Sequence, residues 1–389
     1  MKNETQPWRV LIKAAFLFAV VNLIFAMANP PVGKITLFNT VFPGRLRFPY
    51  EQEPKYYFVG LNAPVYEDFD TMFGTHVISK MKSGDEFRLV LLGDSSTWGL
   101  TLQSGDTLSE QINNLGLQTC DGRKVRAYNL GYPLSFLVRD LLILDKAMEY
   151  QPDMIVWLIT LSTLEPKAAE TYFILPHADR YLRLVDAYNL SYLDLVHPVS
   201  APSFFDRTII GQRQRLKDIL FTQALGILWT ATGIDNHEGL VPEPAPPTHN
   251  VENNIYYDGR PPGDAPMIFD SLMMDAMSVG YDIAGDVPIV LVNQPIFIAD
   301  GLNNQVRYDD IYPRWVYDEY RQFMFNWADI NDRSYLDYWN ALSQGDFSDQ
   351  HFHRNPHGEK RFAAMLAPKL QKLVCFSSRN SFHDKSGIQ

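Results

Sequence analysis

The chain has 389 residues, with 34 lysines and arginines against 45 aspartates and glutamates, and a formal net charge of −11. This acidic balance argues against a protein whose main role is to bind nucleic acid, because that role needs a positive surface. Hydrophobic residues make up 46% of the chain, which is enough to bury a large core and excludes intrinsic disorder for most of it. The two cysteines, Cys120 and Cys375, exclude a disulfide-rich scaffold and a four-cysteine zinc site.

Residues 10–28 form an apolar segment that predicts contact with a membrane. Residues 14–28 carry no charge, and Lys2, Arg9 and Lys13 precede them. The positive-inside rule therefore places the N-terminus in the cytoplasm and the rest of the chain outside it. Residues 1–30 are then either the anchor of a single-pass membrane protein or a signal peptide, which would be cleaved after residues 26–28 to give a secreted protein. A buried helix of a soluble domain is the third interpretation.

Residues 31–86 are expected to form an irregular, aromatic-rich lead-in to a domain spanning residues 87–389. In that domain, apolar runs alternate with segments of helical spacing. The expected strands cover residues 88–93, 125–130, 153–160, 287–292 and 335–339. The expected helices cover residues 107–115, 136–150, 267–278, 312–331 and 358–374. This alternation predicts right-handed crossovers and a parallel sheet with helices on both faces.

A long insertion, residues 165–264, separates the third expected strand from the next helix. It contains a helical run at residues 213–234 and ends in a proline-rich stretch that is typical of a loop. The insertion is either a lid over the active site or a peripheral element that touches the membrane. The apolar stripe of its helix favours packing on the protein, and burial of Leu220, Ile227 and Leu228 is the expected sign of a lid.

The first motif with chemical meaning is GDSS, residues 93–96, at the end of the first expected strand. Ligands of open parallel sheets bind at the carboxyl ends of the strands, so Ser95 is a candidate nucleophile. The simpler interpretation is a serine that caps a helix. A second motif, NLGY at residues 129–132, follows the next strand, and the N–H of Gly131 there is suited to bind an oxyanion.

A third motif, DQHFHRNPHG at residues 349–358, precedes the last expected helix. A serine nucleophile needs a base, and the base needs a carboxylate that holds its tautomer. His353 and Asp349 are the candidates for these roles. Asn293 and Gln294, which follow the fourth expected strand, are candidates for lining the substrate site.

In this order, the motifs resemble those of the SGNH (GDSL-type) hydrolase superfamily. GDSSTWG is similar to the first block of that family, NLGY to the second, and the segment from His353 to Gly358 to the last. The resemblance implies a flavodoxin-like three-layer α/β/α sandwich with Ser95 as nucleophile, His353 as base and Gly131 as oxyanion donor. Members of the family are esterases, lipases, carbohydrate deacetylases and O-acyltransferases.

The sequence departs from the family pattern at two points. Where the third block of the family has an asparagine, this sequence has Ser162. Its hydroxyl can donate one hydrogen bond, but its side chain is shorter than that of asparagine. The aspartate usually lies three residues before the histidine, but Asp349 lies four before His353. A one-residue bulge would restore the contact; Asp346 is the reserve carboxylate and His351 the reserve base.

The expected function is that of an exported serine-dependent ester hydrolase or O-acyltransferase, in which Asp349 orients His353 and Gly131 and Ser162 hold the oxyanion. The expected substrate is an ester-bearing small molecule, glycan or lipid of the cell envelope, and the membrane is contacted through the N-terminal helix. No metal, organic cofactor or nucleic acid is expected. The alternative is a catalytically weak or inactive SGNH-fold protein that serves as a binding or assembly module. Export would also permit a disulfide between Cys120 and Cys375, which follow helices expected to share one face of the sheet.

Overall fold

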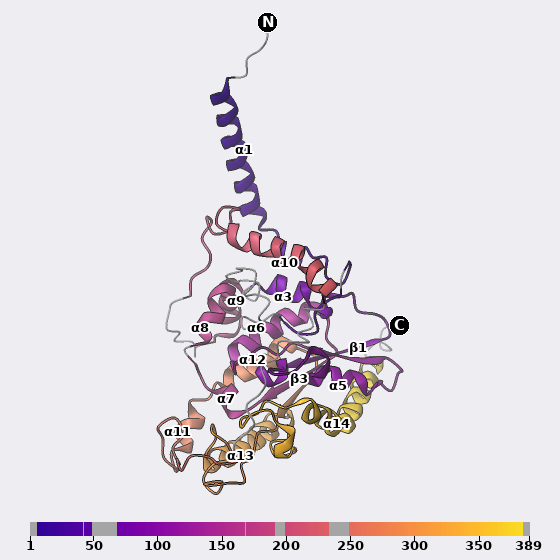
Figure 1. Cartoon of the computed structure of the whole chain (residues 1–389), viewed down its shortest axis with the longest axis vertical. Helices are drawn as coiled ribbons and strands as arrows, with labels where there is room; N and C mark the ends of the chain where they lie inside the picture. Colours follow the sequence, from indigo (N-terminus) through magenta and orange to yellow (C-terminus); the bar gives the residue numbers. More distant parts are fainter. Residues whose placement is uncertain are drawn as a thin grey trace.

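The computed structural model describes residues 6–41, 43–48, 68–167, 169–190, 199–232 and 249–383. Its centre is a five-stranded parallel sheet in the order β2-β1-β3-β4-β5 (Figure 1). The strands are β1 (Glu86–Leu92), β2 (Lys124–Asn129), β3 (Met154–Ile159), β4 (Ile289–Asn293) and β5 (Ser334–Asp337). All five strands predicted from the sequence are therefore present, and the predicted α/β class is confirmed.

The sheet separates two hydrophobic cores, because successive side chains of a strand point to opposite faces. In β3, Trp157 is buried in one core and Val156 in the other. Helices α6 (Leu137–Ala147) and α12 (Met274–Ala284) pack together over the Trp157 face. Helices α5 (Leu108–Asn114) and α14 (Pro356–His383) pack together over the opposite face. Both faces are thus covered, which explains why the central strands β1, β3 and β4 are mostly apolar and almost entirely buried.

The helix predicted at residues 267–278 is in fact two helices, α11 (Ala265–Asp270) and α12. The break occurs because the N–H of Met273 donates to the carbonyl of Leu164, at 2.9 Å, instead of continuing the helical ladder. The helix predicted at residues 312–331 is α13 (Arg314–Ile330). Short elements connect the main ones: α4 (Ser95–Trp98), η3 (Ser104–Asp106), η4 (Met148–Tyr150) and η7 (Gln344–Asp346).

The lead-in is more ordered than the sequence predicted. Its described part contains η1 (Val32–Lys34), α3 (Phe69–Thr75) and η2 (Val77–Ser79). Helix α3 buries Met72 and Phe73 completely in the same core as Trp157. The expectation of an irregular lead-in is therefore wrong for residues 69–79, because their aromatic side chains complete the domain core. Residues 49–67 lie outside the described part.

The insertion begins with α7 (Leu161–Leu164), α8 (Glu170–Ile174), η5 (Leu175–His177) and α9 (Ala178–Tyr188), and continues with α10 (Arg213–Thr232). Helices α8 and α9 have no counterpart among the elements predicted from the sequence. Helix α10 lies between α1 and α3, away from α7 and α11 (Figure 1). Leu220 of α10 is 69% exposed, so it does not show the burial expected of a lid; the side chains of Ile227 and Leu228 lie outside the described part.

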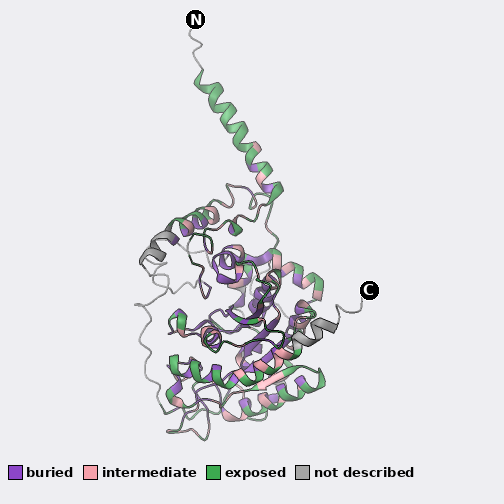
Figure 2. Ribbon diagram, turned by 90° about the vertical axis from the view of Figure 1, so that its right-hand side faces the viewer, coloured by how far each residue is buried: buried purple, intermediate pink, exposed green. Residues whose placement is uncertain are grey.

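Helix α1 (Pro7–Ala28) projects from the domain, and nearly all of its surface is exposed (Figure 2). It is long and apolar enough to cross a membrane, and no other helix in the described residues is. At about 1.5 Å per residue, its 22 residues extend about 33 Å, which matches a hydrocarbon core of about 30 Å. The interpretation as a buried helix of a soluble domain is wrong, because only 11% of its apolar stretch is buried.

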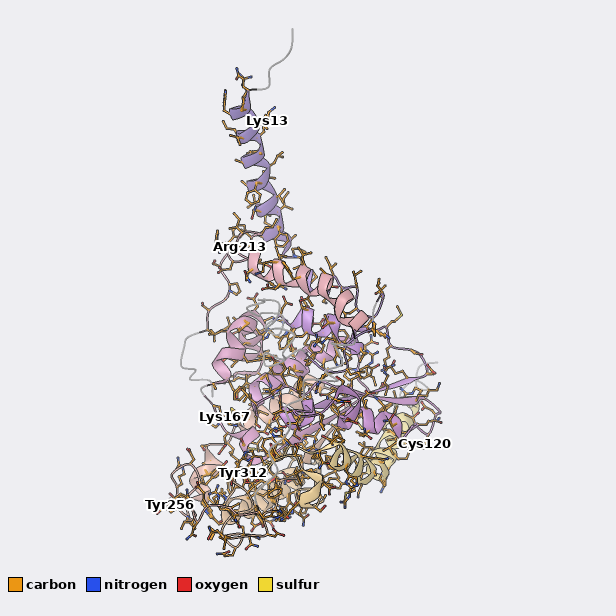
Figure 3. The ribbon with its side chains drawn as sticks, viewed as in Figure 1. Lys13, Cys120, Lys167, Arg213, Tyr256 and Tyr312 are labelled. Atoms are coloured by element: carbon orange, nitrogen blue, oxygen red, sulfur yellow. A yellow bond between two sulfur atoms is a disulfide. The ribbon has the colours of Figure 1, made fainter. Side chains whose placement is uncertain are left out.

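The predicted disulfide is present. Cys120 follows α5, Cys375 lies in α14, and their Cα atoms are 4.7 Å apart. Figure 3 shows Cys120 at the side of the domain, far from Lys167 and Tyr312. The bond joins the two helices that cover one face of the sheet, as the topology suggested.

Candidate active site

The site is formed where three neighbouring strands end. Strand β1 lies between β2 and β3, and all three run in the same direction. The residues that follow them, Ser95, Gly131 and Ser162, therefore meet at one edge of the sheet. This arrangement brings together the first two motifs and Ser162, which are far apart in the sequence.

Ser95 is the first residue of α4, at a sharp turn between strand and helix. Gly93 makes the turn possible: its φ is +149°, and a Cβ there would lie 2.4 Å from the Thr97 hydroxyl oxygen. Asp94 caps the helix by accepting the N–H of Ser96 at 2.9 Å. As the first helical residue, Ser95 has an N–H without a helical acceptor, which leaves it available to a ligand.

His353 lies directly against Ser95. The Ser95 Oγ is 2.7 Å from the His353 Nε2, and the His353 Nδ1 is hydrogen-bonded to the carboxylate of Asp349. Ser95 is 7% exposed and the His353 side chain 12% exposed, so bulk water is largely kept from the pair. The three predicted catalytic side chains thus form one continuous chain of hydrogen bonds.

The loop itself explains how Asp349 reaches a histidine four residues later. Phe347 and Arg354 pair as an antiparallel bridge, and the Ser348 N–H donates to the His353 carbonyl at 2.9 Å. Inside this tight loop, Asp349 Oδ1 accepts the N–H groups of His351 and His353 at 3.0 and 3.3 Å. The extra residue is absorbed by the loop, and the departure from the usual spacing does not separate the carboxylate from the ring.

Neither reserve candidate takes part. Asp346 accepts hydrogen bonds from Ser343, His357 and Arg361, and it shapes the turn before the catalytic loop. The backbone carbonyl of His351 accepts the N–H of Phe297 at 2.6 Å, and this contact fixes the position of the residue. His353, not His351, is the histidine that contacts Ser95.

The environment keeps Asp349 ionised. Burial alone would raise its pKa, but the hydrogen bond and charge of His353 and the N–H of His351 outweigh burial, and the net pKa is lowered. An ionised Asp349 accepts the Nδ1 proton of His353, which leaves the Nε2 lone pair facing Ser95. This is the tautomer that a general base requires.

The predicted oxyanion donors are only partly in place. Gly131 packs closely against the turn after Ser95, since a Cβ on Gly131 would lie 2.6 Å from the backbone nitrogen of Trp98. Its N–H, however, donates to the side-chain oxygen of Asn129 at 3.0 Å. The expected role of Gly131 therefore requires this N–H to be shared with Asn129 or released when substrate binds.

Ser162 has a partner that sequence reasoning missed. Lys167 Nζ donates to the Ser162 Oγ at 2.9 Å and to the Ser135 carbonyl at 2.8 Å. The hydroxyl oxygen of Ser162 is thus an acceptor of the lysine, and its own proton is free to point elsewhere. A single lysine near the start of an insertion carries no sequence signal for this contact.

Beneath the site lies a buried polar network. Asp94 Oδ2 accepts from Gln294 at 2.9 Å, and Gln294 Oε1 accepts from Ser96 at 2.7 Å and from Arg354 at 3.2 Å. Arg354 pairs with Glu359 at 3.1 Å, with both side chains fully buried. Asn293 is bonded to Asp337 and Tyr317. The expectation that Asn293 and Gln294 line the substrate site is therefore wrong, since both are fully buried and hold the loops in place.

The described residues contain no group of three histidine, cysteine, aspartate or glutamate side chains that could hold a metal ion.

No model of a known protein family matches the chain, and no curated protein matches it. The fold and the site define an α/β protein with a Ser–His–Asp constellation at the carboxyl edge of its sheet. Any functional assignment therefore depends on the geometry of these residues.

Proposed function

We propose that this protein is an exported, membrane-anchored serine hydrolase or O-acyltransferase of the SGNH type that acts on an ester. The observation that carries the proposal is the contact of 2.7 Å between Ser95 Oγ and His353 Nε2, with Asp349 on the other ring nitrogen. A buried nucleophile, its base and an orienting carboxylate are the parts that acyl transfer needs.

In the proposed reaction, Ser95 Oγ attacks the acyl carbon while His353 Nε2 takes the hydroxyl proton. The tetrahedral oxyanion is held by the N–H of Ser95, with Gly131 and Ser162 as further donors. When the intermediate collapses, the ester C–O bond breaks and His353 returns the proton to the leaving alcohol. Water or a second alcohol, deprotonated by His353, then attacks the acyl–Ser95 ester. The bond between the acyl carbon and Ser95 Oγ breaks, His353 returns the proton to Ser95, and the acid or the new ester leaves.

The order of the elements supports membership of the SGNH superfamily and a flavodoxin-like arrangement. The strand order 2-1-3-4-5 is that of flavodoxin-like folds. The nucleophile follows the first strand, and the base and carboxylate lie on the loop before the last helix. An esterified glycan, lipid or small molecule of the cell envelope is the proposed substrate.

The proposed location is the outer side of a cell membrane, with α1 as a single anchor. The arginine and lysines that precede the uncharged part of α1 favour a cytoplasmic N-terminus. The disulfide supports this side, since disulfides persist in oxidising compartments. The exposed length of α1 is suited to a bilayer and not to the domain core.

A non-catalytic binding or assembly module is the competing function. It is favoured by the Gly131 N–H, which is already donated to Asn129 at 3.0 Å. Removing one oxyanion donor costs roughly 2.7–4 kcal/mol of transition-state stabilisation. A protein with this defect would keep its fold but lose catalytic turnover.

Labelling with a fluorophosphonate probe tests the proposal, because the probe traps a serine that is activated by its base. Wild-type protein in detergent is expected to label at Ser95. Ser95→Ala and His353→Ala are expected to lose the label, whereas Ser83→Ala, which alters an exposed serine, is expected to keep it. Absence of labelling in folded wild-type protein would contradict the enzyme proposal and support the binding module.

A further inference from the structure

The chain segment before α10 touches the membrane helix within its apolar stretch. Asn22 of α1 is 6% exposed, although it belongs to a helix that is otherwise open. Its amide nitrogen donates to the Phe18 carbonyl at 2.9 Å, and its amide oxygen accepts the N–H of Ile210 at 3.2 Å. A polar group in the membrane is costly unless it is paired, and here the domain supplies the partner.

This contact fixes the height of the segment relative to the bilayer. Asn22 precedes the end of α1 at Ala28 by six residues, which is about 9 Å along the helix axis. Ala26, one turn further on, is also buried, at 3% exposure. If α1 spans the bilayer, residues around Ile210 lie at the boundary between the headgroups and the acyl chains.

Large apolar side chains just before α10 and in its first turns are exposed. We define the juxtamembrane face as the five exposed residues Phe204, Phe205, Ile210, Leu220 and Phe221. Their exposed fractions range from 40% for Ile210 to 69% for Leu220. The backbone is closely packed at Gly211, in the turn between Phe205 and α10. A Cβ on Gly211 would lie 2.3 Å from the Phe205 carbonyl oxygen. Figure 1 shows α10 against the end of α1, on the side of the domain that faces the anchor.

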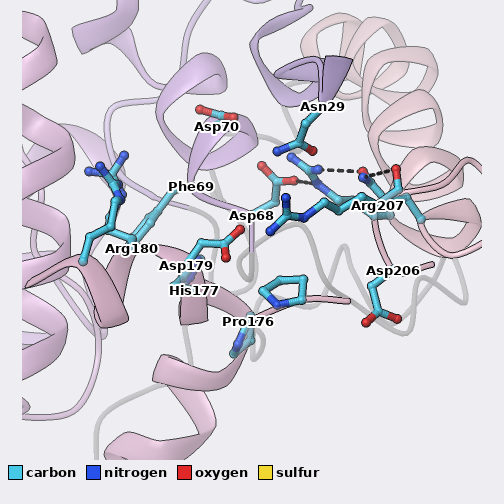
Figure 4. Close-up of a pocket in the computed structure, with 14 residues that line it drawn as sticks. Asn29, Asp68, Phe69, Asp70, Pro176, His177, Asp179, Arg180, Asp206 and Arg207 are labelled. Atoms are coloured by element: carbon cyan, nitrogen blue, oxygen red, sulfur yellow. Dashed lines mark hydrogen bonds and ion pairs between the residues drawn. The ribbon is translucent and has the colours of Figure 1, made fainter. Parts of the chain in front are cut away.

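A cavity lined by arginines lies beside this face. It has a volume of about 460 Å³ and reaches Asn29, the residue that caps the C-terminal end of α1 (Figure 4). Arg215 is held by Asp68 and Gln212, and Arg180 by Asp145 and Glu149. The buried Nε of Arg207 has no hydrogen-bond partner among the described residues.

The cavity also contains carboxylates, so its charge is balanced. Three of its four aspartates are engaged: Asp68 by Arg215, Asp70 by Lys146 and Asp206 by Ser203. The site is therefore suited to a phosphate that arrives in a headgroup without net charge. Its position at the end of the anchor makes the lipid around α1 the nearest source of such a phosphate.

We propose that the juxtamembrane face docks on the outer leaflet of the bilayer that α1 spans, with a phospholipid phosphate bound at Arg207. Apolar side chains of such faces insert about 5–10 Å into the boundary between headgroups and acyl chains. Continuity with α1 argues for lipid as the occupant, because the Ile210–Asn22 contact places the start of the face at that depth and α10 continues from it. It follows that α1 is retained as an anchor, since cleavage after residue 28 would remove the contact. The proposal does not depend on the chemistry at Ser95.

Site-directed fluorescence quenching tests this docking. The native cysteines are paired, so Phe205→Cys or Leu220→Cys gives the full-length chain one free thiol for a bimane label. The matched control is Phe325→Cys on α13, which is 61% exposed and lies at the end of the domain away from α1. In phosphatidylcholine nanodiscs with doxyl-labelled lipid, we expect roughly twofold or greater quenching at positions 205 and 220 relative to position 325. Equal quenching at all three positions would overturn the docking proposal.

A second substitution tests the phosphate. Arg207→Gln in the Phe205→Cys background is expected to reduce the quenching at position 205, with Arg333→Gln, an exposed arginine beside Tyr281, as the control. Circular dichroism establishes that each variant is folded. Unchanged quenching in a folded Arg207→Gln variant would overturn the role of Arg207. If the protein isolated from its native host lacks residues 1–28, the proposal that α1 is retained as an anchor is wrong.

Discussion

Lys167 changes what Ser162 can do at the candidate active site. Ser162 stands where the SGNH pattern has an asparagine, and a hydroxyl has fewer donors than an amide. The ammonium of Lys167 donates to its oxygen at 2.9 Å, so in the proposed reaction the hydroxyl proton is left for the oxyanion, and the bond to the ammonium makes the hydroxyl a stronger donor. Burial lowers the pKa of Lys167, while Glu165 and Glu170 act in the opposite direction. We infer that Lys167 is a positioning residue that restores part of the missing oxyanion donor.

Lys167→Met is expected to lower kcat for hydrolysis of p-nitrophenyl acetate by up to about a hundredfold, with little change in KM, because the lost donor acts on the transition state. Ser162→Ala should have a similar effect, and the double variant should be no worse than either single one. Lys372→Met, which alters an exposed lysine on α14, is the control. Additive losses in the double variant would show that the two side chains act separately.

Among the elements, Glu170 of α8 joins the insertion to the core. The residue before α6, Phe136, has no side-chain cap, and the carboxylate of Glu170 instead accepts the Val138 N–H at 3.0 Å. Glu170 is fully buried. Burial raises its pKa to about 7, against the opposing effects of Arg139 and Lys167.

This pKa predicts how stability depends on pH. The unfolded chain releases the Glu170 proton near its ordinary pKa of 4.5, while the folded chain keeps it until about 7. Stability is therefore lost as the pH rises through this window. We expect Glu170→Gln, whose amide oxygen can still accept from Val138, to gain up to about 3 kcal/mol relative to wild type between pH 5 and pH 8.

Thermal melts of the full-length protein in detergent at the two pH values measure this difference. Glu319→Gln, on the exposed surface of α13, should follow wild type. Parallel pH dependence of wild type and Glu170→Gln would mean that Glu170 ionises normally in the folded protein.

In the whole molecule, one covalent bond closes most of the domain. The Cys120–Cys375 disulfide spans 255 residues. In the chain-entropy model, closing a loop of that length raises the free energy of the unfolded chain by about 5.5 kcal/mol. We expect Cys120→Ser to lower Tm clearly, and Cys120→Ser/Cys375→Ser to lower it no further. Reductant should lower the Tm of wild type and leave that of the variants unchanged, as measured by differential scanning fluorimetry. A wild-type Tm that does not respond to reductant would contradict a structural role for the bond.

Local pattern was sufficient to predict much of this protein. Strands β1, β3 and β4 are short and mostly apolar runs, and residues near in sequence decide such elements through their side-chain period. Ser95, His353 and Asp349 could be predicted because each belongs to a motif at a strand end or before a helix. The sequence permitted a Cys120–Cys375 disulfide, because a flavodoxin-like sheet would place the helices before the two cysteines on one face, but it left two free thiols as the alternative.

Other features depend on contacts between distant segments, which no local pattern encodes. Met273 breaks a helix because the carbonyl of Leu164 is near, and Gln294 is buried because Asp94, Ser96 and Arg354 surround it. The Gly131 N–H is engaged because the side chain of Asn129 turns back toward it.

The sequence by itself thus determined the α/β class, the apolar N-terminal helix and the residues at the carboxyl edge of the sheet, since each follows from the period or order of neighbouring residues. Only the tertiary structure decided that Lys167 supports Ser162 and that Ile210 pairs with Asn22 across 188 positions of chain. The physical reason is that a hydrogen bond depends on where folding places its donor and acceptor, and the packing of the whole chain sets those positions.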